Sequence, residues 1–196
     1  MDAMDALATI VTSPEKFLKQ NIISIAGGSK NGQTKARFLK RKNNEFKFDA
    51  AGMSGKEGVE VNVWNFRMVR DSEAVNLEAV DHLHVQNQRP QICITGKLSG
   101  CTVLLSPEGN NSIRAAHIQP GGVRPGGNDT QAILEGQALM GGAPVETAFG
   151  PEEYTPERAH TAHVIGFARP NGWEFWAQTC HGCAGSQRIV EVRQLT

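Results

Sequence analysis

Residues 101–118 read CTVLLSPEGNNSIRAAHI, in which two apolar segments flank the turn-forming residues 107–111. Such an arrangement is typical of a β-hairpin closed by a loop of five residues. The resulting register places Cys101 directly opposite His117. Directly opposite residues of an antiparallel pair share one face of the sheet, with Cβ atoms about 4.5–5.5 Å apart. We therefore expect the thiol and the imidazole to be neighbours that share a hydrogen bond, whereas a slip of one residue would separate them.

Patterns elsewhere in the chain predict more strands and a few helices. Strand-like patterns occur in segments 45–48, 59–66, 80–86, 92–95, 163–168, 173–178 and 188–195, and apolar and polar residues alternate in the first three. Residues 2–20 have helical apolar spacing with a break at Ser13 and Pro14, and a helix is expected from Asp129 to Met140. These elements favour an α+β fold with a mixed or antiparallel, β-sandwich-like core flanked by helices. We expect one domain over residues 1–196, with residues 1–20 as a candidate helical N-terminal appendage.

Composition excludes several classes of protein. Lys and Arg together number 20, as do Asp and Glu, so the net charge is zero, which argues against a dedicated nucleic-acid-binding protein. Four cysteines in a chain of this length are not typical of a disulfide scaffold. The apolar runs are too short to span a membrane, and the N-terminus lacks the features of a secretory signal peptide.

Cys101 and His117 are residue types that together support nucleophilic catalysis. A free thiol has a pKa of about 8.5, and an adjacent imidazolium lowers it so that the reactive thiolate is present near neutral pH. Ser99 and Gly100 permit a tight turn before the cysteine, and backbone amides there are expected to donate to an oxyanion. Spacing alone leaves another interpretation open, in which Cys101 is a core thiol and His117 an ordinary strand histidine.

The segment from Thr95 to Cys101 reads TGKLSGC, and together with His117 it resembles the signature of a glutamine deamidase superfamily. That superfamily includes the catalytic domain of cytotoxic necrotizing factor, the Burkholderia lethal factor and the chemoreceptor deamidases of chemotaxis. The tetrapeptide Leu-Ser-Gly-Cys at 98–101 is similar to the form in the two toxins. Residues 116–120 are similar to the histidine region of the chemotaxis enzymes. The resemblance covers residues 95–120.

This resemblance implies a role for each matching residue. Cys101 would be the nucleophile, His117 the acid and base, and Thr95 the residue that orients the histidine. The three residues that precede the cysteine would support the motif and the oxyanion: Leu98, Ser99 and Gly100. The family's fold is a compact sandwich-like core with peripheral helices, and its chemistry needs no metal or organic cofactor.

The resemblance also implies a partner and a destination. The substrate would be a glutamine side chain on another protein, hydrolysed to glutamate through a thioester, with transglutamination as an alternative outcome. The long segment before Thr95 favours the toxin-like arrangement over a chemotaxis-type receptor deamidase. An effector of this type would be made in the bacterial cytoplasm and delivered to a target-cell cytosol by a specialised secretion system.

Two features suggest a non-catalytic alternative. Cys180 and Cys183 form a CxxC that, with His160 and His163, could supply four zinc ligands, although an HxxH on a strand directs its two imidazoles to opposite faces. Residues 30–47 contain seven basic residues against the single acid Glu45, which is typical of a solvated face. A zinc-stabilised or basic-faced protein-binding module therefore remains a second hypothesis.

Overall fold

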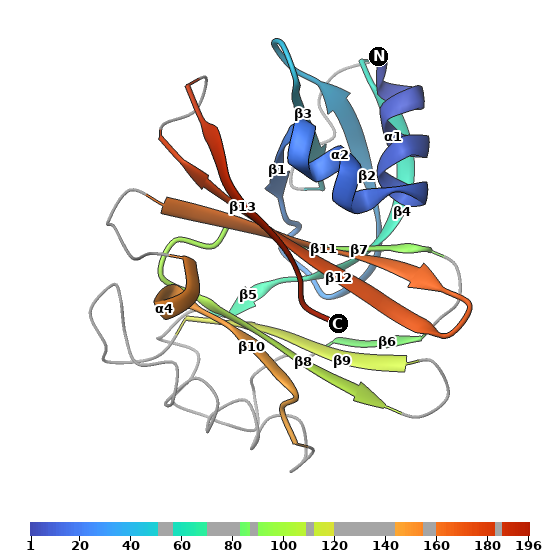
Figure 1. Cartoon of the computed structure of the whole chain (residues 1–196). Helices are drawn as coiled ribbons and strands as arrows, with labels where there is room; N and C mark the ends of the chain where they lie inside the picture. The colour runs from blue at the N-terminus through green and yellow to red at the C-terminus, as the bar shows by residue number, and fades with distance from the viewer. Residues whose placement is uncertain are drawn as a thin grey trace.

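The fold consists of two β-sheets and a pair of N-terminal helices (Figure 1). A computed structural model describes residues 1–50, 57–69, 83–86, 90–108, 112–119, 144–154, 160–182 and 186–196. The helix expected from Asp129 to Met140 lies outside these residues. The predicted class, α+β with a sandwich-like core of mixed and antiparallel sheets flanked by helices, is confirmed.

The larger sheet has eight strands in the order β1-β3-β2-β4-β7-β11-β12-β13. It is mixed, because β1 pairs with β3 and β4 with β7 in parallel. The strands are β1 (Ile22–Ala26), β2 (Gly32–Lys40), β3 (Glu45–Asp49), β4 (Val59–Phe66), β7 (Ile92–Thr95), β11 (His160–Arg169), β12 (Gly172–His181) and β13 (Arg188–Gln194).

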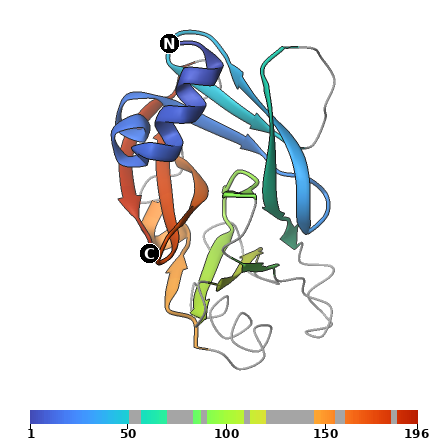
Figure 2. The same cartoon turned by 90° about the vertical axis from the view of Figure 1, so that its right-hand side faces the viewer.

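The smaller sheet has five strands and contains the predicted hairpin. Its order is β10-β8-β9-β5, and a further strand, β6, also pairs with β9. The strands are β5 (Met68–Val69), β6 (Leu83–Gln86), β8 (Thr102–Glu108), β9 (Ser112–Ile118) and β10 (Thr147–Phe149). In Figure 2 this sheet lies below the larger one, on the side away from the N-terminal helices.

Two helices cover the outer face of the larger sheet. Helix α1 (Ala3–Thr12) ends before Ser13, and α2 (Pro14–Gln20) begins with Pro14, whose missing N–H is no loss in the first turn of a helix. Both helices bury apolar side chains, including Ile10 and Phe17, in a core shared with β1–β4, β7, β11 and β12. None of the helices in the described part of the chain is long and apolar enough to cross a membrane.

A second core fills the space between the two sheets and determines where His117 points. Alternate residues of the hairpin, such as Val103 and Ala115, pack there against side chains of β11 and β12. Because strand side chains alternate between faces, His117, two residues beyond Ala115, points into the same space. The site residue on β9 is therefore directed toward the larger sheet.

The hairpin is present, but the predicted register is wrong by two residues. His117 lies opposite Val103, not Cys101, because the strands continue to a pairing of Glu108 with Ser112 and the loop is correspondingly shorter. An ion pair of 2.5 Å between Glu108 and Arg114 stabilises this longer ladder. A shift of two preserves the face, so Cys101, just before β8, becomes a diagonal neighbour of His117.

Candidate active site

A hydrogen bond across the two sheets links Thr95 to His117. Thr95 is the last residue of β7, and its Oγ1 lies 2.7 Å from Nδ1 of His117 on β9. The same hydroxyl donates to the carbonyl oxygen of Phe66 at 2.7 Å. A hydroxyl has one hydrogen, and the carbonyl takes it, so Thr95 accepts from His117. Nδ1 of His117 therefore carries the ring hydrogen.

This tautomer leaves Nε2 of His117 as a proton acceptor. The side chain is 0% exposed, and burial lowers its pKa to about 3, so the ring is neutral near pH 7. Nε2 is buried and has no hydrogen-bond partner among the residues that the structure describes. A neutral imidazole with a free lone pair is the form that accepts a proton from a thiol.

Met68 connects Cys101 to the neighbourhood of His117. The Cys101 side chain is 4% exposed, and its Sγ lies 3.3 Å from Sδ of Met68. Met68 is the cross-strand partner of His117 in the parallel pair of β5 and β9, so their side chains share one face. The expected hydrogen bond between thiol and imidazole is replaced here by this contact of the thiol with the thioether.

Residues 98–100 form the turn before Cys101, and hydrogen bonds to β11 fix its first residue. Leu98 exchanges two backbone hydrogen bonds with Ala162 of β11, at 2.9 and 3.1 Å. Gly100 has a φ of +116°, a conformation that residues with a Cβ rarely adopt. Ser99 lies between them and is exposed. The Leu-Ser-Gly sequence therefore forms a fixed turn that sends Cys101 back between the sheets.

The backbone amides of this turn are not directed as predicted. The N–H groups of Gly100 and Cys101 donate to the hydroxyl of Tyr154, at 2.8 and 3.0 Å. The same hydroxyl donates to the carbonyl of Cys101 at 2.8 Å. These two amides are therefore engaged by a phenol and are not free for an oxyanion. The backbone N–H of Ser99 instead interacts with the Cys101 sulfur.

The thiol is not held as a thiolate by an imidazolium. Burial raises the pKa of Cys101, and the backbone hydrogen bond from Ser99 lowers it by less. Since His117 is neutral, the premise that an imidazolium lowers the thiol pKa is wrong for this state. The arrangement instead favours a neutral thiol and a neutral imidazole near pH 7.

Asn65 fixes the loop next to Thr95. Its side chain is buried, accepts from Gly28 N–H at 2.9 Å, and donates to the carbonyls of Gly28 and Lys30 at 3.1 and 2.6 Å. Asn65 pairs with Ile94 in the parallel ladder of β4 and β7. The loop before β2 is thereby fastened to the strand ends that present Thr95 and the carbonyl of Phe66.

Comparisons with known proteins give a likeness in fold. No protein-family model and no curated protein matches the sequence. The structure is similar to the C-terminal domain of CNFy from Yersinia pseudotuberculosis. The match covers 99% of each chain at 9% sequence identity, with a TM-score of 0.48.

The three candidate zinc ligands that the structure describes form no metal-binding cluster. His160 and His163 lie on opposite faces of β11, and Nδ1 of His163 accepts a hydrogen bond of 3.3 Å from the N–H of Ile25. Cys180 is buried on β12, and Cys183 lies outside the described residues. Within the described ranges no group of three or more potential metal ligands is found. His160 and His163 therefore do not share a zinc site.

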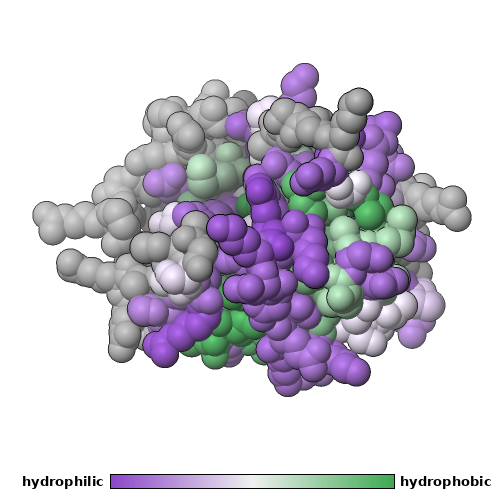
Figure 3. Space-filling view, turned by 90° about the horizontal axis from the view of Figure 1, so that it is seen from above, coloured by the Kyte–Doolittle hydropathy of each residue, from purple (hydrophilic) through white to green (hydrophobic). Residues whose placement is uncertain are grey.

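The basic segment 30–47 runs from the loop before β2 into β3. Ion pairs join Lys35 to Glu60 at 2.7 Å and Lys47 to Asp49 at 2.6 Å. Figure 3, which views this end of the molecule from above, shows hydrophilic side chains gathered across the middle of the face. Part of the basic charge is thus balanced within the chain.

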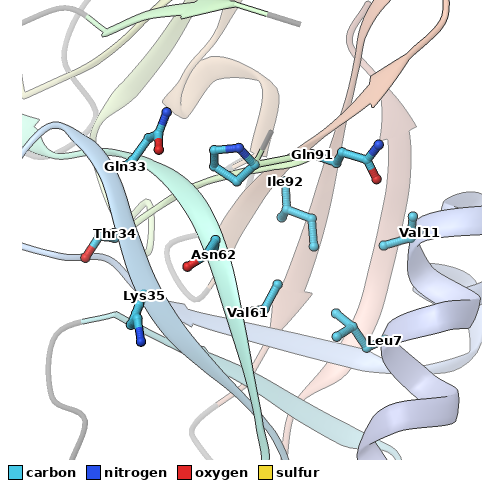
Figure 4. Close-up of a pocket in the computed structure, with 10 residues that line it drawn as sticks. Leu7, Val11, Gln33, Thr34, Lys35, Val61, Asn62, Gln91 and Ile92 are labelled. Carbon is cyan, nitrogen blue, oxygen red and sulfur yellow. The ribbon is translucent and has the colours of Figure 1, made fainter. Parts of the chain in front are cut away.

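A surface groove of about 560 Å³ lies away from the Cys–His pair (Figure 4). Its lining comes from α1, β2, β4 and the start of β7. Leu7 and Val61 form part of its apolar wall, and Gln33 and Asn62 part of its polar wall. None of the predicted site residues lines it, so it has no part in the chemistry of Cys101.

Three residues of the site were not predicted from the sequence. Phe66 contributes only a carbonyl, Met68 an acceptor for the thiol, and Tyr154 a hydroxyl for the turn. No local motif marks Phe66 or Met68. Tyr154 carried one signal, since it is the single tyrosine in the chain, but nothing in the sequence places it beside residue 101.

Proposed function

We propose that this protein is a protein-glutamine deamidase of the bacterial effector or toxin type. The observation that supports it is the hydrogen bond from His117 to Thr95, which leaves Nε2 as a proton acceptor on a histidine diagonal to Cys101 in the hairpin register. A structural histidine would gain nothing from an oriented, unpartnered Nε2 in a buried space. A general base requires both features.

The chemistry follows from these groups. The Cys101 thiol gives its proton to Nε2 of His117, and the sulfur attacks the carbon of a glutamine carboxamide. The tetrahedral intermediate collapses when the imidazolium protonates the departing nitrogen, so ammonia leaves and a thioester remains. His117 then removes a proton from water, hydroxide adds to the thioester, and glutamate and the thiol are restored.

Thr95 and Ser99 support this sequence of steps. Thr95 keeps the ring hydrogen on Nδ1, so each proton passes through Nε2. The Ser99 N–H, which interacts with the sulfur, is the donor that we assign to stabilise negative charge first on the thiolate and then on the carboxamide oxygen of the tetrahedral intermediate. In this proposal, the support expected from Leu98, Ser99 and Gly100 comes from their backbone and not from their side chains.

Two parts of the proposal, the protein substrate and the delivery into another cell, rest on the resemblance of the Leu-Ser-Gly-Cys motif to that of the toxins. A chemotaxis-type receptor deamidase would use the same chemistry on a different target. Both would convert a neutral carboxamide into a carboxylate on a folded partner. Identification of the modified protein therefore separates the two.

The test is mass spectrometry of bacterial and eukaryotic cell extracts incubated with the purified protein. We expect conversion of a specific glutamine to glutamate, with release of ammonia, and loss of both in Cys101→Ser. Cys180→Ser is the matched control, because Cys180 is also a buried thiol but belongs to another strand. Conversion that persists in Cys101→Ser, or that is absent with wild-type protein on every extract, would refute the proposal.

A further inference from the structure

Tyr154 ends a short helix that lies against the nucleophile turn. Helix α4 (Pro151–Tyr154) follows β10, and the tyrosine ring is 0% exposed, with its centroid 5.5 Å from that of Phe149. Glu153 pairs with Arg193 of β13 at 2.7 Å. The helix is therefore attached to the larger sheet on one side and places its final side chain in the core between the sheets.

The Tyr154 hydroxyl defines the backbone around Cys101. It accepts two N–H groups and donates to one carbonyl, all within Gly100 and Cys101. Three hydrogen bonds to two consecutive residues fix the peptide planes on both sides of the Cys101 α-carbon. Gly100 adopts its positive φ at this same point. The direction of the Cys101 side chain depends on this geometry.

Hydrogen bonds and packing hold the Tyr154 hydroxyl in a fixed position. Removing it would leave two N–H donors and one carbonyl acceptor without this partner in a position that is buried or partly buried. The packed ring leaves little room for another orientation. With the amides of Gly100 and Cys101 engaged, the Ser99 N–H is left to face the sulfur.

We propose that Tyr154 is a positioning residue, whose hydroxyl holds the backbone of Gly100 and Cys101 and thereby sets the direction of the Cys101 side chain. This inference rests on the proposed nucleophilic role of Cys101. Tyr154 lies outside the motif and more than fifty positions along the chain from Cys101. The inference gives this distant residue control of the position of the thiol.

The first test is Tyr154→Phe, which keeps the ring and removes only the hydroxyl. We expect kcat for glutamine deamidation to fall at least about tenfold with little change in KM, because misplacement of a reacting group by about 1 Å can cost a hundredfold. Alkylation of Cys101 by iodoacetamide should slow in parallel. The control is Phe149→Leu, which disturbs the packing of the Tyr154 ring but leaves the hydroxyl in place.

A wild-type kcat and alkylation rate in a folded Tyr154→Phe protein would overturn the inference. A rise in kcat would also overturn it, since it would show that the phenol blocks amides needed by the oxyanion. The alkylation rate requires no glutamine substrate. If deamidation is never found, the proposed function fails, whereas the role of Tyr154 is still decided by alkylation.

A second test uses the natural residue. The chain has one tyrosine, so protein made with 3-fluorotyrosine carries fluorine at position 154 alone. We expect its fluorine resonance to shift when Cys101 is alkylated and to stay unchanged when Cys101→Ser protein is treated in the same way. A resonance that does not respond to Cys101 alkylation would contradict a coupling between phenol and nucleophile, even if Tyr154→Phe failed to fold.

Discussion

The Thr95 hydroxyl and the His117 imidazole, 2.7 Å apart, belong to different sheets. One contact therefore joins the two layers of the fold and selects the tautomer of a buried histidine. The Thr95 hydroxyl donates its hydrogen bond to the carbonyl oxygen of Phe66. Only one assignment of hydrogens is therefore consistent, in which Nδ1 of His117 carries the ring hydrogen.

Replacement of Thr95 by valine should impair catalysis more than stability. Valine has a similar shape but accepts no hydrogen bond, so the ring hydrogen of His117 loses its partner and can move to Nε2. General acid–base catalysis contributes about 10²–10⁴-fold, and we expect kcat to fall by about 10–100-fold. Thr95→Ser keeps a hydroxyl and should retain most of the activity. Equal rates in Thr95→Val and wild type would show that the contact has no catalytic role.

Stability should decline with acid well above the range of carboxylate titration. Burial lowers the pKa of His117 from 6.5 to about 3 and that of His163 from 6.5 to about 4. Between these values the unfolded chain binds protons that the folded chain does not, so stability is complete above pH 6.5 and is lost as pH falls. For His117 the loss at pH 5 is roughly 2 kcal/mol.

Urea unfolding between about pH 7.5 and pH 5 measures this effect. The free energy of unfolding should decrease with acid in wild type and decrease less in His117→Gln. His163→Gln is the companion variant, because His163 is also buried but lies on β11 of the larger sheet. A free energy of unfolding that is independent of pH over this interval would show that neither histidine is buried in its neutral form.

Alkylation of Cys101 should increase with pH through neutrality without levelling off. Burial raises the pKa of this thiol, so the thiolate fraction grows throughout the neutral and mildly alkaline range. Cys180, whose pKa is raised to about 11, should react more slowly and serves as an internal comparison. Iodoacetamide labelling followed by peptide mapping gives both rates. A plateau for Cys101 by pH 7 would instead indicate a thiolate–imidazolium pair.

Alanine at position 100 should strain the nucleophile turn. Gly100 has a φ of +116°, and holding a residue with a Cβ there costs about 1–3 kcal/mol. We expect Gly100→Ala to lower both the melting temperature and the alkylation rate of Cys101. Gly96→Ala is the matched control, because a Cβ at that position would meet its nearest neighbour at 3.9 Å. Equal effects of the two substitutions would contradict a special role for the turn.

The sequence predicted the parts of the fold that have a clear hydrophobic period. The alternating segments at 45–48, 59–66 and 173–178 are strands, and the break at Pro14 separates two helices. Strand β2 was not predicted, because its exposed positions carry Lys35 and the segment was interpreted as a charged face. Only pairing with β3 and β4 on both sides makes this segment a strand.

The site was predicted in part for a similar reason. The sequence motif identified Thr95, Cys101 and His117 as candidate site residues. The register between the two strands, however, depended on where the loop ends. Pro107 and Glu108 have turn-forming or neutral character, yet they continue the strand opposite Ile113 and Ser112. The contact of Tyr154 with residue 101 depends on the packing of distant segments, which no local pattern encodes.

The hydrogen positions on His117 provide the most direct test of the account. In ¹⁵N-histidine-labelled protein at neutral pH, long-range proton–nitrogen correlations distinguish the two ring nitrogens. His163 is an internal reference, since its Nδ1 accepts from Ile25 N–H and its hydrogen must lie on Nε2. His117→Gln and His163→Gln assign the signals. We predict a neutral His117 with the hydrogen on Nδ1 and a bare Nε2; a hydrogen on Nε2, or on both nitrogens, would contradict it.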